Sequence, residues 1–129
     1  MHYLLPVTSD PVRLIGLPYR LGANPAKHHA TDCINLCRVV LDHYGIPSPE
    51  PHRSWYRRLR LGDTTVFTEQ LDLWGHPVVS PTAGTIAFDG KGLAAYYEDG
   101  WLHCSTITKS VEWAPCVNSV ALYCHGKSS

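Results

Sequence analysis

The chain has little that would attract it to a membrane or a charged polymer. Its formal net charge is zero, with 11 Lys and Arg against 11 Asp and Glu, so no overall field draws it to nucleic acid or anionic lipid. No stretch approaches the roughly 20 apolar residues of a membrane-spanning helix. The segment Met1–Pro6 lacks a basic start, and its apolar run is too short for a secretion signal. We therefore expect a protein made in the cytoplasm without membrane contact, whose export would need another route, such as packaging inside a particle.

The cysteine content excludes a complete disulfide framework. There are five cysteines, an odd number, and 44% apolar residues in 129 are enough for a core without disulfide or metal support. Cys37 fits a small buried residue on a helix face. Cys104 and Cys124 fall in strand-like runs, and a disulfide among Cys104, Cys116 and Cys124 stays open. The length indicates one domain over residues 1–129.

The spacing of apolar residues predicts helices in the first part of the chain. Residues 33–44 place apolar side chains at the three/four spacing of one buried helix face. Thr31 or Asp32 can cap the N-terminus of this helix, and Gly45 can end it. Three shorter helices are expected, over residues 10–17, 53–61 and 64–74.

The later part of the chain has the pattern of short strands. Asp89-Gly90 and Asp99-Gly100 are turn dipeptides that separate β-like runs. Helices followed by a meander of strands are typical of the α+β class. We expect the N-terminal helices to pack on a C-terminal antiparallel sheet, with the helix of Cys33 across it. The expected strands cover residues 84–88, 93–97, 101–104, 110–113 and 117–123.

Cys33 is a candidate nucleophile because of its place in the first turn of the predicted helix. Unpaired backbone N–H groups and the helix dipole favour a thiolate there. A thiol with an ordinary pKa near 8.5 still needs an imidazole, which accepts its proton and later protonates the leaving amine. The histidines of the chain therefore decide what Cys33 can do.

Several motifs resemble those of NlpC/P60 cysteine peptidases. Residues 15–23 read Ile-Gly-Leu-Pro-Tyr-Arg-Leu-Gly-Ala and precede Thr31-Asp32-Cys33, which resembles the family pattern G-x-P-Y-x-x-G-G … D-C-S-G. Residues 84–88 resemble the strand G-D-L-V-F-F, and residues 93–103 resemble V-G-I-Y-x-G-x-G-x-x-I-H. The resemblance spans about residues 12–113 in the family's order. It implies a papain-like α+β core that cleaves short peptides of bacterial cell walls.

The resemblance also implies roles for individual residues and shows one serious departure. Cys33 matches the nucleophile, His103 matches the third, orienting residue, and Tyr19 and Asp32 match residues that contact substrate. The family's base directly precedes the V-G-I-Y run, and this chain has Gly92 there. Losing a general acid–base typically costs on the order of 10²- to 10⁴-fold in rate. We therefore interpret the chain as a degenerate peptidase.

Other histidines are alternatives for the missing base. His28 and His29 lie shortly before Cys33 on a loop that must approach the helix, but either ring would have to come within about 3 Å of the thiol. Solvated loop histidines are the simpler interpretation. His103 could swing toward Cys33 or be a strand histidine hydrogen-bonded in place. A crude set of metal ligands is also present, made of His28, His29, Cys33 and Cys37. However, the buried face of the predicted helix already explains both cysteines. We therefore expect no metal and no cofactor.

Residues 53–60 carry a basic and aromatic patch. A helix would place Arg53, Arg57 and Arg60 on one face while Tyr56 turns inward. A solvated helix face is the simpler interpretation. Contact with an acidic partner or polymer is the more specific interpretation. The zero net charge makes nucleic acid a poor candidate.

Two functional hypotheses follow from these observations. The first is a structural or binding protein that uses the old cleft as a docking surface. Because small stand-alone members of the family resemble domains of bacteriophage tails, the implied setting is a phage tail or baseplate with protein partners. The second is an active endopeptidase on peptidoglycan stem peptides, in which His103, His28 or His29 assists Cys33. The partner, the stoichiometry of an assembly and the wall peptide stay open.

Overall fold

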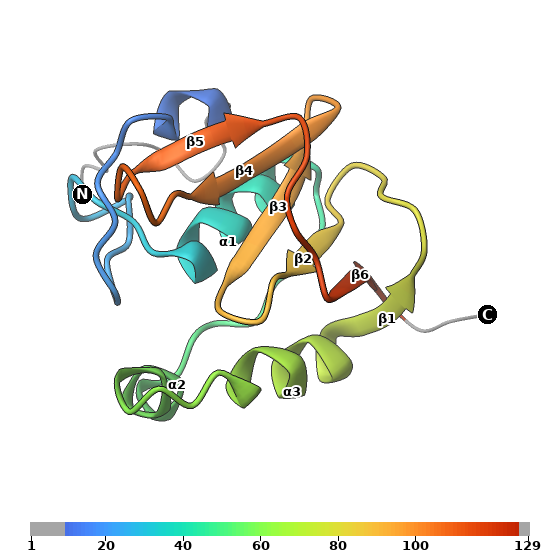
Figure 1. The fold of residues 1–129 in the computed structure, drawn as a ribbon, viewed down its shortest axis with the longest axis horizontal. Helices are drawn as coiled ribbons and strands as arrows, with labels where there is room; N and C mark the ends of the chain where they lie inside the picture. Colours follow the sequence, from blue (N-terminus) through green and yellow to red (C-terminus); the bar gives the residue numbers. More distant parts are fainter. Residues whose placement is uncertain (1–9, 127–129) are drawn as a thin grey trace.

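The helices lie on one face of a six-stranded sheet in the computed structural model, which describes residues 10–126 (Figure 1). The helices predicted over 33–44, 53–61 and 64–74 are confirmed to within a residue at each end. The helix predicted over 10–17 is a single 3₁₀ turn, because the backbone is already extended at Ile15 (φ −58°, ψ 129°) and turns at the left-handed Gly16 (φ 94°). The helical elements are η1 (Pro11–Leu14), α1 (Cys33–His43), α2 (Arg53–Arg60) and α3 (Thr65–Trp74).

The sheet is antiparallel throughout, with the strand order β1-β6-β2-β3-β4-β5. The α+β class and the antiparallel sheet predicted from the sequence are confirmed. The strands are β1 (Gly75–Val78), β2 (Ile86–Phe88), β3 (Leu93–Tyr97), β4 (Gly100–Cys104), β5 (Val111–Ala114) and β6 (Ala121–His125).

The predicted meander is correct only for β2 to β5. After β5 the chain crosses back over the sheet, and β6 inserts between β1 and β2 (Figure 1). Residues 115–120 form this crossing segment, and of these residues 117–120 were expected as the start of the last strand. Strand β1 was not predicted, because a four-residue strand with Pro77 at its centre shows no alternation of polar and apolar residues.

The alternation of side chains along β3 and β4 defines two faces of the sheet. The inner face carries Ala95 and Leu102, which share the main hydrophobic core with Leu36 and Val40 of α1. The outer face carries a smaller apolar cluster, made of Ala87, Ala94 and Trp101 with Val117 and Leu122 packed against it. Since neighbouring residues of a strand point to opposite faces, this register decides which polar side chains can reach α1. No helix within the described residues is long and apolar enough to cross a membrane.

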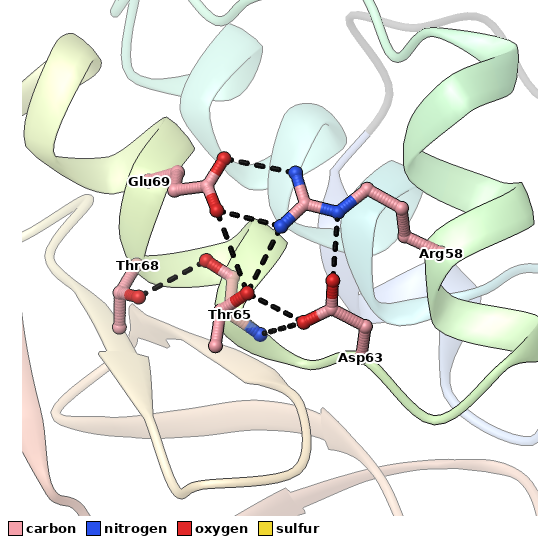
Figure 2. A network of polar contacts seen from close by, with 5 residues as sticks. All are labelled: Arg58, Asp63, Thr65, Thr68 and Glu69. Carbon is pink, nitrogen blue, oxygen red and sulfur yellow. Dashed lines mark hydrogen bonds and ion pairs between the residues drawn. The ribbon is translucent and has the colours of Figure 1, made fainter.

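Arg58 joins α2 to α3 through a network of hydrogen bonds and ion pairs (Figure 2). Its Nη1 and Nη2 donate to the two carboxylate oxygens of Glu69 at 2.8 and 2.6 Å, and its Nε donates to Asp63 at 2.8 Å. Asp63 also accepts the backbone N–H of Thr65 at 3.1 Å, which supports the predicted start of α3. The network thereby fixes the turn between the two helices.

We predict that Arg58→Gln lowers the melting temperature at pH 6. Hydrogen bonds from Thr65 and Arg58 lower the pKa of Asp63, and those from Arg58 lower the pKa of Glu69. A lowered carboxyl pKa stabilises the fold above the ordinary pKa, and this contribution is lost as the pH falls through the lowered value. The difference from wild type should therefore shrink below the ordinary values of 3.8 and 4.5, and also in high salt. Arg57→Gln is the matched control, and an equal loss there would contradict the prediction.

Candidate functional site

The site is built around the N-terminus of α1, which Asp32 caps. Asp32 is fully buried, and its Oδ1 accepts the backbone N–H of Asn35 at 2.7 Å. Its Oδ2 accepts the N–H of Gly22 at 2.8 Å. Of the two predicted caps, Asp32 is therefore the residue that caps, while the Thr31 hydroxyl donates to the Asp32 carbonyl at 3.0 Å. The cap also fixes the preceding loop, because Gly22 belongs to that loop.

Asn35 and Tyr56 extend this network from α1 to α2. Asn35 Nδ2 donates to the Ala23 carbonyl at 3.1 Å and to the Tyr56 hydroxyl at 3.3 Å. Tyr56 thus turns inward, as predicted. Burial raises the pKa of Asp32, although its hydrogen bonds from Asn35, Gly22 and Tyr56 lower the pKa in part. The α1 N-terminus is therefore a rigid, hydrogen-bonded anchor for the next residue, Cys33.

Cys33 faces Gly92, at the start of β3. A Cβ atom at position 92 would lie 3.6 Å from the Cys33 Sγ, an ordinary van der Waals contact. Gly92 is held there by Asp89, whose Oδ1 accepts the N–H groups of Lys91 and Gly92, both at 2.7 Å. The structure therefore brings together the two positions that the motif resemblance assigns to a nucleophile and its base.

The surroundings of Cys33 disfavour the thiolate form of its side chain. Burial raises its pKa well above the ordinary 9.0, and the neighbouring Asp32 raises it further, while a backbone hydrogen bond from Leu93 lowers it. Cys33 is only 9% exposed. This direction of the pKa shift is opposite to the one expected for a helix N-terminus, because burial and the Asp32 charge both disfavour the thiolate.

The structure does not bring His103 to Cys33. His103 pairs with Ala94, and Ala94 belongs to the apolar cluster of the outer face. Its neighbour Cys104 lies on the inner face and contacts the main core. His103 is therefore on the side of the sheet away from α1, because side chains alternate along β4.

His28 and His29 belong to a separate, open hollow of about 410 Å³. His28 is held by its own loop, since its Nδ1 accepts the backbone N–H of Asn24 at 3.0 Å. Cys33 does not line this hollow. The lining residues are Pro18, Tyr19, Arg20, His28, His29 and Ala30.

Tyr19 lines this hollow and is also close to the start of α1. It forms an isolated parallel bridge with Thr31, and the N–H of Arg20 donates to the Thr31 carbonyl at 3.0 Å. Burial raises the pKa of Tyr19 to about 12, and the nearby Cys33 and Asp32 contribute to the rise. Tyr19, Asp32 and Cys33 are thus neighbours, as the sequence motifs suggest.

Cys104 is a neighbour of the site that the sequence reading missed. Burial raises its pKa to about 12, and it raises the pKa of both Cys33 and Cys37. Counting alternate residues from the buried Leu102 would have placed Cys104 on the inner face. All five cysteines are free in the structure, so no disulfide joins Cys104, Cys116 and Cys124 there. Within residues 10–126, no three or more His, Cys, Asp or Glu side chains converge as metal ligands would.

Comparisons with known proteins identify no relative of the chain. No family model, no curated protein and no solved structure matches the chain. A functional assignment therefore depends on the geometry around Cys33 and on the sequence motifs.

Proposed function

We propose that the chain is a catalytically idle relative of NlpC/P60 peptidases that acts as a structural or binding component. One observation carries the proposal: Gly92 occupies the position beside the Cys33 Sγ where a cysteine peptidase of this type has its base. The groups that act on the thiol pKa are Asp32, Asp89, Cys104 and a backbone N–H, and none of them is an imidazole. Within the described residues, no hydrogen bond joins Cys33 to a histidine.

The chemistry of peptide cleavage explains why this arrangement is idle. A neutral thiol must lose its proton before attack, and a protonated base must then protonate the leaving amine. Asp32 cannot do this, because both of its oxygens accept backbone N–H groups and its charge opposes the thiolate. The helix dipole cannot donate a proton. Without an imidazole, the rate falls by about 10²- to 10⁴-fold.

The proposed setting follows from the resemblance to small phage-tail domains. In a tail tip or baseplate, the surface around Tyr19 would serve as a docking site for a protein partner. The 42% exposed Tyr19 and the open hollow beside it offer such a surface. The alternative, cleavage of peptidoglycan stem peptides, would need one of the histidines to reach Cys33.

The rate of Cys33 alkylation as a function of pH tests the proposal. We expect the Cys33 thiol to titrate above its ordinary pKa, in wild type and in His103→Ala alike, because His103 lies on the outer face. Peptide mapping by mass spectrometry separates Cys33 from the exposed Cys116. A thiol pKa below about 7 that rises in His103→Ala would favour the peptidase instead. So would cleavage of stem peptides that Cys33→Ser abolishes.

A further inference from the structure

Three arginines of α2 form a cationic face that no ion pair in the described structure uses. Arg53, Arg57 and Arg60 follow one another at helical i, i+4 and i+7 positions, and all three are exposed. The ion pairs within residues 10–126 involve Arg38 and Arg58 instead. We call Arg53, Arg57 and Arg60 the α2 arginine face.

Helix stability explains Arg57 and Arg60, which lie in the last turn of α2 where cations complement the helix dipole, but it does not explain Arg53. Arg53 occupies the first turn of α2, where a cation opposes the helix dipole, and that turn has no acidic residue. Helix α2 holds four of the 11 Lys and Arg of the chain. The remainder of the chain therefore has seven cationic residues against 11 acidic ones. Positive charge is concentrated on this one short helix of an otherwise acidic molecule.

The fourth arginine of α2, Arg58, shows how an arginine of this helix pairs with carboxylates. Arg58 binds both oxygens of Glu69 through two guanidinium nitrogens and reaches Asp63 through its Nε (Figure 2). A guanidinium presents this planar fork to carboxylates, whereas a lysine offers only a point charge. All four cations of the helix are arginines.

We propose that the α2 arginine face docks on an acidic surface of a partner protein, with carboxylates pairing to Arg53, Arg57 and Arg60. Arginine is enriched at protein interfaces and among the residues that contribute most to their affinity. Three phosphate contacts would give nucleic acid only weak, salt-sensitive binding. This interface is independent of whether Cys33 is idle.

A fluorescein-labelled oligoglutamate peptide is the probe for this interface. We expect saturable binding at an ionic strength of about 0.01 M and weaker binding at about 0.15 M, because salt screens exposed charges. Replacing Arg53, Arg57 and Arg60 together by glutamine should raise the Kd about tenfold, since each exposed pair contributes a little. The control triple variant Arg13→Gln, Lys91→Gln and Lys109→Gln removes the same charge from other exposed positions. Its Kd should stay within about twofold of wild type.

Several results would overturn the proposal. These are absence of binding by wild type, an equal loss in the control variant, or tighter binding of a DNA duplex through the same arginines. A second measurement on the unmodified protein guards against unfolding of the triple variant. The peptide should protect Arg53, Arg57 and Arg60 from phenylglyoxal, while the exposed Arg13 should react as before. Equal protection of Arg13 would also contradict the proposed interface.

Discussion

Replacing Gly92 with histidine should turn Cys33 from a neutral thiol into a reactive one. A side chain at position 92 starts 3.6 Å from the Cys33 Sγ, and Gly92 does not have the left-handed backbone that would strain a histidine. The imidazole can accept the thiol proton and pair with the thiolate, which lowers the Cys33 pKa. We expect alkylation of Cys33 at pH 7 to accelerate by about 10²-fold or more. The measurement is the alkylation rate of the peptide containing Cys33.

The matched control is Gly92→Gln, which fills the same space without a titratable base. Its Cys33 should alkylate as slowly as in wild type. Equal acceleration in both variants would mean that the substitutions merely open the site, and no acceleration in Gly92→His would show that position 92 does not face the thiol as described. Cleavage of a peptidoglycan stem peptide by Gly92→His would link the position directly to a peptidase ancestry.

Asp32→Ala should destabilise the fold by about 2–4 kcal/mol. The fully buried carboxylate accepts the N–H groups of Gly22 and Asn35, and alanine would leave both donors without a partner. The loss would affect both the start of α1 and the loop before it. The free energy of unfolding from urea titration measures the effect.

Asp32→Asn separates the two roles of the carboxylate. Its side-chain carbonyl can still accept one of the two N–H groups, so we expect a smaller loss of about 1–2 kcal/mol. The same variant removes the negative charge beside Cys33 and should lower the pKa of the thiol, because that charge helps to raise it. Wild-type stability in Asp32→Ala would show that the cap is not needed, and an unchanged thiol pKa in Asp32→Asn would show that burial acts alone.

Most local elements could be predicted because their signals are local. The apolar spacing of 33–44, the capping side chain of Asp32 and the turn dipeptides around β3 and β4 each act within a few residues. The helices and the central strands therefore appear where the pattern indicates. The helix expected over 10–17 is shorter than predicted, because the chain is already extended at Ile15 and turns at Gly16.

The position of β6 could not be predicted, because it depends on pairing between distant residues. β6 inserts between β1 and β2, and the crossing segment 115–120 covers the outer face through Val117. A strand of only four residues, such as β1, cannot be recognised from its own sequence, because it is defined by its pairing with β6. Such long-range contacts leave no periodicity in the sequence.

The sequence by itself determined that Cys33 starts a capped helix, that no histidine occupies position 92 and that α2 concentrates the arginines. Only the tertiary structure decided what surrounds these residues. It buries the Cys33 thiol beside Asp32, turns His103 to the outer face and sets Gly92 against the sulfur. It also pairs Arg58 and leaves Arg53, Arg57 and Arg60 exposed. The physical reason is that caps and periodicity act between neighbours in the chain, whereas burial, strand register and charge pairing depend on segments that meet only in the folded protein.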